Sequence, residues 1–389
     1  MTFNADVSLT DTQLRASAVP VSQASQPLPT GAATSANQTS GGQKTQIVNG
    51  AGTTLSSVTD PSVGVALFAC NITKGTAISQ GLLTGHRNYR GFGYDPAIAA
   101  TITDVSGRSA PIVYPTTATL PYAVSTSAND TGTILKKSVA TGGSTTVLID
   151  TTGTSFITLG IVAGDVVLND TDVTNGIVVT VDSAIQLTIR PVAPATYSGK
   201  NYRIVRAAST GGSVIEIHSL AANFTEQSEY IVMNGVTPVA GTKTMLRINN
   251  SPYMAVGSLG VPAGNTSIQN VGVTQIYSYI GAGLNMCLQA GYTVPAGYNM
   301  FMSAWHGGSS GNKPLRILLR ATADFHDRAL TAGVFHVQDL IMALNGDQQH
   351  RFELPLKFPP QCDVKISANV IGAGTGECGC GFEFWIEPI

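Results

Sequence analysis

Charged side chains are scarce in this chain of 389 residues. Asp, Glu, Lys and Arg make up 11% of it, against roughly 25% in an ordinary soluble domain. The formal net charge is −2, whereas a protein that binds duplex nucleic acid needs a basic face to displace counterions from phosphate. We therefore expect no nucleic-acid partner.

Long apolar segments are missing as well. No stretch approaches the roughly 20 uninterrupted apolar residues that cross a bilayer, so we expect no membrane insertion. The opening residues, Met1-Thr2-Phe3-Asn4-Ala5-Asp6, lack the basic and apolar segments of a secretory signal. This composition predicts a protein made in a cytoplasm.

The cysteines do not have the number or spacing of a set of disulfide bonds. There are five, an odd number, and only Cys378-Gly379-Cys380 brings two of them close in sequence. A zinc site would need a second ligand pair, so we expect ordinary thiols and no metal site. Oxidation of Cys378 and Cys380, or a cross-link between subunits through them, stays open as an alternative.

Sequence motifs of catalysis are absent too. The chain has no G-x-x-x-x-G-K-[ST] phosphate loop, no G-x-S-x-G elbow and no H-E-x-x-H. The densest acidic cluster, Asp324 to Asp327 with Asp339 and Glu353 further on, is interpreted as a solvent-facing loop rather than a carboxylate pair. We expect no catalytic residue, no cofactor and no enzymatic activity, and we keep a glycan-cleaving enzyme as the less favoured alternative.

Residues 1–60 are rich in Ser, Thr, Gln, Asn, Ala and Gly, and Phe3 is their one aromatic residue. Such a segment buries too little apolar surface to offset its own ordering entropy, and its prolines favour extended conformations over helix. It is predicted to be an extended anchoring arm that becomes ordered on another protein. The candidate anchoring residues are Leu14, Val19, Val21 and Leu28.

From about residue 61 the pattern is typical of β-strands. Ile185, Leu187 and Ile189 alternate with polar residues, as in half-buried strands, and turn pairs such as Asn234-Gly235 recur at short intervals. The best helical candidate, Val337 to Asn345, fits a strand equally well. We therefore predict an all-β chain with β-sandwich or jelly-roll-like domains.

The segment 133–208 is interpreted as a small β-barrel-like domain inserted into a polar loop, since such loops tolerate insertions. Its host would be a first β-sandwich formed by 61–132 and 209–283, and 284–389 would form a C-terminal jelly-roll-like sandwich. Within the insertion, strands are expected near Thr145–Ile149, Asp165–Leu168, Ile177–Val181, Ile185–Arg190 and Tyr202–Val205.

A short polar and aromatic run precedes one of the expected strands. His86, Arg87, Tyr89 and Arg90 would suit a small polar binding patch. We favour the alternative interpretation, a solvated loop before the strand.

Several motifs together resemble virion structural proteins of tailed bacteriophages, of the head or tail appendage type (fibre or spike). They are Phe92-Gly93-Tyr94-Asp95-Pro96, the block from Glu229 to Val239 followed by Met245-Leu246-Arg247-Ile248-Asn249, the turn Tyr292 to Gly297, and Phe352 to Pro359. The arm from Leu9 to Val21 resembles N-terminal segments of phage appendage proteins. Each motif is weak alone, but their shared order is more specific.

The resemblance implies a non-enzymatic virion appendage, such as a fibre, spike or knob. Its partners would be tail, portal, adaptor or capsid proteins, contacted through the arm, and further copies of itself in a homotrimer. For the oligomer contact we expect Phe382, Phe384 and Trp385, on a strand that is apolar on both faces. The alternatives are a capsid decoration protein and an adhesin that recognises a host surface glycan or protein, for which Tyr89, Tyr94, Tyr253 and Trp305 are candidate recognition residues.

Overall fold

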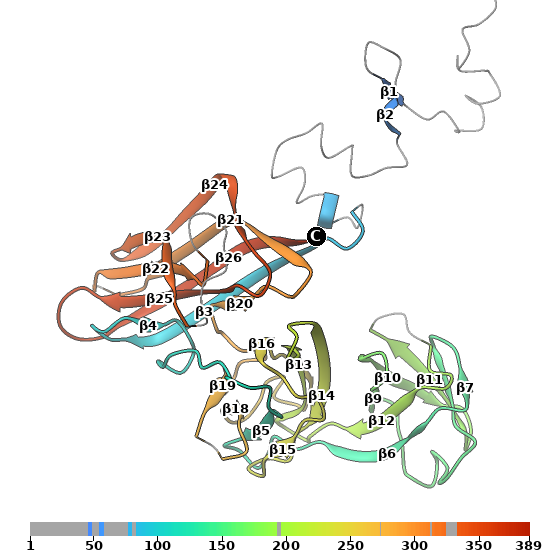
Figure 1. Ribbon diagram of the computed structural model, residues 1–389. Coiled ribbons are helices and arrows are strands. Elements are labelled where there is room, and N and C mark those ends of the chain that lie inside the picture. The colour runs from blue at the N-terminus through green and yellow to red at the C-terminus, as the bar shows by residue number, and fades with distance from the viewer. Residues whose placement is uncertain are drawn as a thin grey trace, which may run out of the picture. The chain divides into compact units, whose positions relative to one another are not determined.

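The computed structural model describes residues 46–48, 54–57, 77–79, 83–192, 196–272, 274–311, 313–323 and 333–389 (Figure 1). Apart from a helical turn over 77–79, the regular elements of these residues are β-strands, and the strand pairs run antiparallel. The predicted all-β fold class is confirmed.

Residues 1–67 are a unit of their own. Within it, β1 (Gln46–Val48) pairs with β2 (Thr54–Ser57). The candidate anchoring residues Leu14, Val19, Val21 and Leu28 lie outside the described residues, so the anchoring role of 1–60 stays a prediction.

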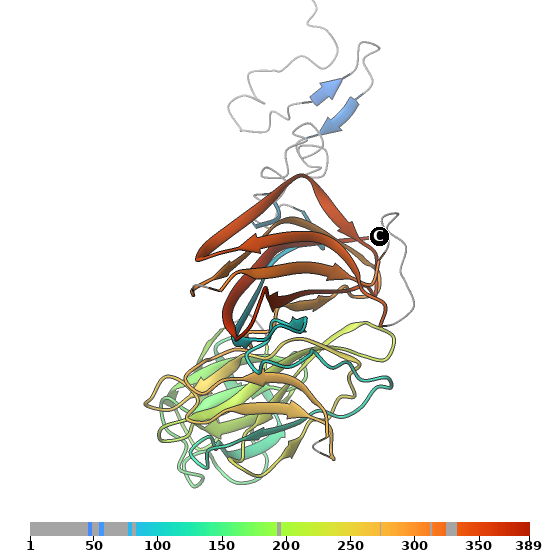
Figure 2. The ribbon, with the colours of Figure 1, turned by 90° about the vertical axis from the view of Figure 1, so that its left-hand side faces the viewer.

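In the second unit, residues 68–389, the C-terminal strands build a two-layered sandwich. One sheet has the order β24-β21-β26-β3, and the other has the order β20-β25-β22-β23 with β4 beside β25. Figure 2 shows the orange and red strands of this sandwich as one group. The bounds are β3 (Arg87–Ile98), β4 (Thr103–Asp104), β20 (Gly291–Thr293), β21 (Tyr298–Ser309), β22 (Leu315–Ala321), β23 (His336–Ala343), β24 (Gly346–Phe358), β25 (Asp363–Val370) and β26 (Gly376–Pro388).

The two-residue repeat of each strand sends alternate side chains into the sandwich core. Met300 and Met302 of β21 and Ile317 of β22 meet there around Trp305, which is fully buried. The register shifts between Met302 and Ala304, a β-bulge that changes which residues face inward. The inward-facing residues of β21 therefore follow the two-residue alternation of a strand, except at the bulge.

Two strands depart from the expected domain limits. The prediction placed 61–132 in the first sandwich, but β3 pairs with β26 along most of its length and β4 pairs with β25 (Figure 1). Gly91 makes the close packing of β3 possible, because a Cβ there would lie 2.6 Å from the ring of Phe382. The assignment of residues 87–104 to the first sandwich was wrong because strand pairing between distant segments leaves no local signal.

Between β4 and β20 the chain forms a second pair of sheets. One has the order β14-β13-β16 with β17 beside β13, and the other has the order β15-β5-β18-β19. Ile215 and Ile217 of β13 pack with Ile268 of β18 in their shared core. The bounds are β5 (Tyr122–Ser125), β13 (Gly212–Leu220), β14 (Glu226–Val232), β15 (Val239–Ala240), β16 (Arg247–Asn250), β17 (Tyr253–Val256), β18 (Thr266–Gln269) and β19 (Ile276–Ile280).

Within 133–208, which we call the module, seven strands form one sheet in the order β6-β12-β9-β10-β11-β8-β7. Its ends are neighbours, since Thr133 opposes Arg206 across the β6–β12 pair. All five expected strands are present, and β6 and β7 were missed. The bounds are β6 (Thr133–Val139), β7 (Gly142–Gly143), β8 (Val147–Ile149), β9 (Val166–Asn169), β10 (Thr174–Val181), β11 (Gln186–Pro191) and β12 (Asn201–Arg206).

The module also shares apolar contacts with its host. Val166, Leu168 and Val205 of the module pack with side chains of β13 and β14, including Tyr230. The backbone oxygen of Tyr230 accepts a hydrogen bond from the Arg203 guanidinium at 2.9 Å. The module thus has its own core and a second, smaller one against β13 and β14.

Candidate functional site

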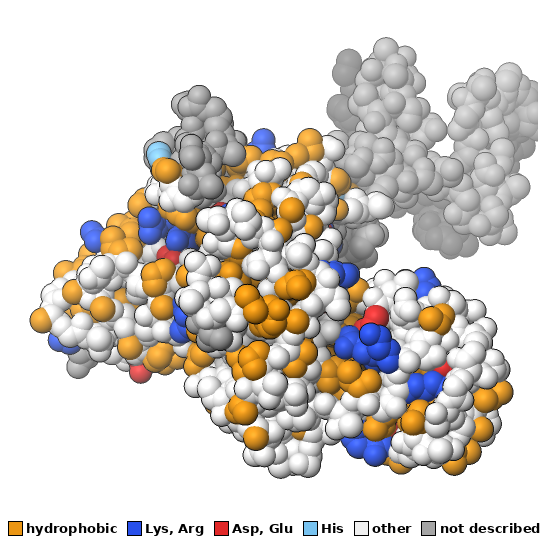
Figure 3. Space-filling model, turned by 60° about the horizontal axis from the view of Figure 1, so that its bottom comes forward, with side chains coloured by type: hydrophobic (Ala, Val, Ile, Leu, Met, Phe, Trp, Pro, Cys, Tyr) orange, Lys and Arg blue, Asp and Glu red, His pale blue; other side chains and the backbone are white. Residues whose placement is uncertain are grey.

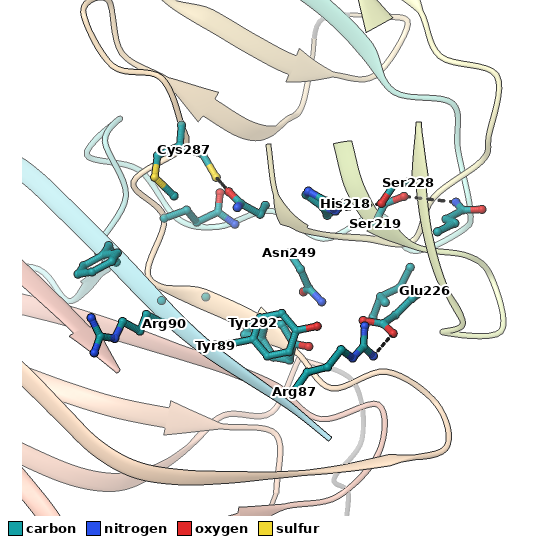
Figure 4. A pocket seen from close by; sticks show the side chains of 18 of the residues that line it. Arg87, Tyr89, Arg90, His218, Ser219, Glu226, Ser228, Asn249, Cys287 and Tyr292 are labelled. Carbon is teal, nitrogen blue, oxygen red and sulfur yellow. Dashed lines mark hydrogen bonds and ion pairs between the residues drawn. The ribbon is translucent and has the colours of Figure 1, made fainter. Parts of the chain in front are cut away.

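A cavity of about 550 Å³ lies where the sandwich meets the second pair of sheets (Figure 4). Its volume falls within the roughly 300–1,000 Å³ typical of small-ligand sites. We call it the β3–β14 cleft. Its lining residues are Arg87, Tyr89, Arg90, Gly91, Phe92, Asp172, Val173, His218, Ser219, Leu220, Glu226, Gln227, Ser228, Asn249, Asn250, Met286, Cys287, Gln289, Gly291, Tyr292 and Phe384.

One wall of the cleft is aromatic. The ring centroid of Tyr292 on β20 lies 4.6 Å from that of Phe384 on β26 and 5.7 Å from that of Tyr89 on β3. Tyr89 stacks on Phe384 at 5.3 Å. Arg87, Tyr89 and Gly91 share one face of β3 because side chains alternate along a strand, which brings Arg87 and Tyr89 to the cleft together.

The hydroxyl of Tyr292 is the least satisfied group of this wall. The residue is only 8% exposed, and its hydroxyl is buried without a hydrogen-bond partner among the described residues. Burial raises the pKa of Tyr292 well above its usual value, so the hydroxyl is protonated and neutral at physiological pH. A buried polar atom without a partner costs about 1–3 kcal/mol. Figure 4 shows Tyr292 beside Tyr89 and below Asn249.

The opposite wall carries neutral polar side chains. Nδ1 of His218 lies 2.9 Å from Oγ of Ser228, and burial lowers the pKa of His218, so the imidazole is uncharged at neutral pH. Oδ1 of Asn250 accepts hydrogen bonds from the backbone N–H of Ser251 and from Sγ of Cys287. Asn249 is held by the backbone of Thr293, whose N–H it accepts at 2.8 Å and whose carbonyl it donates to at 3.0 Å.

Charged side chains around the cleft occur as ion pairs. Arg87 donates to Glu226 of β14 and so connects the two walls. Outside this pair, Asp172 binds Lys200 at 2.9 Å and Arg90 lies 3.4 Å from Glu383. The cleft therefore presents neutralised charge, apolar rings and neutral hydrogen-bonding groups.

No group of three or more His, Cys, Asp or Glu residues that could hold a metal ion occurs among the described residues. Asp339, one of the acids of the sequence analysis, accepts hydrogen bonds from Nε1 of Trp305 and Nδ1 of His350. Residues 324–327 lie outside the described part of the chain.

The four candidate recognition residues separate in the structure. Tyr89 lines the cleft, and Tyr94 is exposed on β3. Trp305 and Tyr253 are buried, and the hydroxyl of Tyr253 lies 2.6 Å from that of Thr266. The surface role expected of Trp305 and Tyr253 is wrong, because alternation on their strands turns both rings into the cores.

The polar run at residues 86–90 belongs to the site after all. Arg87, Tyr89 and Arg90 lie on strand β3 and line the cleft, so the favoured interpretation of a solvated loop was wrong for them. His86 precedes the strand, and its Nδ1 lies 3.1 Å from the backbone oxygen of Thr84. Sequence reasoning missed Tyr292 and Glu226 as site residues, because the residues beside them in the sequence form no recognisable binding motif.

The candidate oligomer residues are internal. Phe382 and Phe384 belong to the sandwich core, and Trp385, on the other face of β26, stacks on Phe301 and is also buried. They are not available as a contact surface of the folded chain. Exposed large apolar residues occur in many parts of the described chain. Those on the sheet-edge strands β23 and β24 and the turn between them are Val337, Leu340, Met342, Leu344 (64% exposed) and Leu354 (84% exposed).

The described cysteines, Cys287, Cys362, Cys378 and Cys380, are free and buried, as expected for ordinary thiols. Cys378 and Cys380 both point into the sandwich core, because they are two residues apart on β26. A cross-link between subunits through them is not compatible with this placement.

No family model, curated protein or solved structure matches this chain. Among the described residues, no helix is long and apolar enough to cross a membrane.

Proposed function

We propose that this chain is a non-enzymatic structural protein of a tailed-phage particle, an appendage attached to the tail or head through residues 1–60. It acts in the virion as a homotrimer whose distal β domains contact the host surface. Its partners are other virion proteins and further copies of itself.

The positions of the resembling motifs in the fold support this proposal. Phe92–Pro96 lies within β3, and Phe352–Pro359 covers the end of β24. The block from Glu229 to Val239 spans the end of β14 and the Asn234-Gly235 turn, where Gly235 has a φ of 57°. Tyr292 to Gly297 leads from β20 into β21. The motifs thus lie on strands of the two pairs of sheets and on the turns that follow them.

The observation that carries the proposal is the apolar edge formed by β23 and β24. Exposed apolar side chains on sheet-edge strands favour association with another chain. Most of the face in Figure 3 is coloured as hydrophobic side chains or as other side chains and backbone, and the charged groups on it are mainly Lys and Arg. A charge-poor protein with an apolar edge suits a permanent place in an assembly, since interface cores are depleted in charge.

The test uses intact particles. Antibodies against the folded chain should label an appendage in electron micrographs, and a chain lacking residues 1–60 should be folded but absent from purified particles. Normal incorporation of the shortened chain would overturn the anchoring role of the arm. Absence of the full-length chain from particles would overturn the proposal as a whole.

The β3–β14 cleft favours host recognition as a second function of the same protein. It combines a volume typical of small-ligand sites with a buried hydroxyl that has no partner among the described residues.

A further inference from the structure

The buried hydroxyl of Tyr292 marks the β3–β14 cleft as a place that lacks an occupant. Native structures leave few buried polar groups without partners. Three such side-chain atoms occur among the described residues, on Asp95, Thr174 and Tyr292, and only Tyr292 is among the residues that line the cleft. A ligand hydroxyl placed beside Tyr292 would supply the missing hydrogen bond.

The charges of the cleft decide against an ionic ligand. The guanidinium of Arg87 is paired with Glu226, and Asp172 is paired with Lys200. The charged lining residues are two arginines, Arg87 and Arg90, and two acids, Asp172 and Glu226. Each has a partner of opposite charge, so an ion of either sign gains no net attraction from the cleft. His218 adds no charge at neutral pH, because burial lowers its pKa. The cleft is therefore suited to a neutral molecule.

Polar and apolar groups surround the cavity on different sides. Tyr89, Tyr292 and Phe384 form the aromatic wall, while His218 and Ser228 face it from the strands opposite, with Asn249 between the two walls (Figure 4). A sugar ring has the matching chemistry, since it carries hydroxyl groups around its rim and C–H groups on its faces.

We infer that the β3–β14 cleft binds a neutral carbohydrate, with the Tyr292 hydroxyl hydrogen-bonded to a sugar hydroxyl. The inference deepens the proposed function, because it names the class of host-surface ligand that the appendage contacts. The cavity of about 550 Å³ holds one or two sugar rings at the end of a longer glycan.

The test is saturation-transfer NMR on the purified full-length chain. D-glucose, D-galactose and N-acetyl-D-glucosamine serve as neutral probes at millimolar concentration, with N-acetylneuraminic acid as the anionic comparison. We expect saturation transfer to at least one neutral sugar and none to the anionic one. Transfer only to N-acetylneuraminic acid, or to no sugar at all, would overturn the inference.

A matched pair of variants locates the site. Tyr292→Phe removes only a hydroxyl that has no partner in the chain, so the fold and its melting temperature should be retained while sugar affinity falls by about tenfold. Tyr94→Phe removes a hydroxyl from an exposed residue of β3 outside the cleft and should bind as the wild type does. Equal affinity of Tyr292→Phe and wild type would place the sugar elsewhere and overturn the assignment.

These outcomes are separate from those of the particle experiment. A chain that is present in virions but binds no neutral sugar keeps its structural role and loses this site. A chain that binds sugar through Tyr292 but is absent from particles keeps the site, and the virion proposal fails.

Discussion

Arg247 of β16 and Asp363 of β25 form a buried, bidentate ion pair that joins the second pair of sheets to the sandwich. Nε and one terminal nitrogen of Arg247 donate to the two carboxylate oxygens of Asp363 at 2.8 and 3.0 Å. The guanidinium also lies 4.4 Å from the ring centroid of Tyr114. Thr293 Oγ1, one residue beyond Tyr292, donates to Asp363 at 2.6 Å. This ion pair therefore fixes β16 and β20, which both line the cleft.

Removing one partner of this ion pair should be strongly destabilising. Arg247→Met leaves Asp363 charged in a buried place, and we expect the free energy of unfolding to fall by about 3–5 kcal/mol. Urea unfolding followed by tryptophan fluorescence measures this, because Trp305 and Trp385 both lie in the sandwich.

Two further variants control this experiment. Arg247→Met combined with Asp363→Leu should recover part of the loss, because no buried charge is left unpaired. Arg90→Met removes an exposed partner of Glu383 and should change stability by no more than about 1 kcal/mol. Unfolding of Arg247→Met at the wild-type urea concentration would show that the ion pair does not hold the sheets together.

The module should lose stability in acid because of Asp150. Burial raises the pKa of this carboxyl, but hydrogen bonds from Thr152, Tyr202 and Lys136 outweigh burial and hold its pKa well below the usual range. A depressed carboxyl pKa stabilises the fold above the unfolded value of about 3.9, and this stability is lost as the pH falls through that value toward the folded pKa. The protection of amides in peptides from 133–206, measured as hydrogen exchange relative to the intrinsic rate at the same pH, should fall below about pH 4.

Asp150→Asn is the matched variant for this pH dependence. Its amides should be less protected than those of wild type at pH 7, because Lys136 loses its charged partner at 3.0 Å, and their protection should depend less on pH. An acid response of the variant as steep as that of wild type would assign the effect to another carboxyl.

Excision of the module should leave a folded but less stable host. The chain enters and leaves through Thr133 and Arg206, which are opposed residues of one strand pair, so joining Gly132 to Ser209 spans a short gap. Tyr230 and Val232 of the host would lose their apolar contacts with the module. We expect a soluble chain with a lower melting temperature in a thermal scan. Aggregation of the shortened chain would show that host and module cannot be separated.

Local patterns predicted the strands of the module well and their partners poorly. Alternation near Ile177–Val181 and Ile185–Arg190 matches β10 and β11, because the periodicity of a strand lies within its own residues. The pairing of β3 with β26 joins opposite ends of the described unit, and no short window of sequence contains it. The same limit explains Phe382: its strand is apolar on both faces because both faces are covered within the chain, not by a second subunit.

The cleft was predictable only in part. Arg87, Tyr89 and Arg90 stand close together in the sequence and were recognised as a polar group. Tyr292 belongs to a turn motif and Glu226 to a strand start, and only the folded topology brings them beside β3. A missing hydrogen bond, such as that of the Tyr292 hydroxyl, is a property of packing and has no sequence signal.

The apolar edge of β23 and β24 should be the contact between subunits. Leu344→Asp combined with Leu354→Asp places charges on side chains that are exposed in the single chain, so the fold should persist while the assembly dissociates, because interface cores exclude unpaired charge. Sedimentation velocity should show trimers for wild type and monomers for the double variant. Ile157→Asp, at an exposed site on the module, controls for added charge and should leave the trimer intact. Phe384→Ser, by contrast, should unfold the sandwich at a cost of about 3–5 kcal/mol. A monomeric wild type, or a double variant that sediments as wild type does, would contradict the role of this edge.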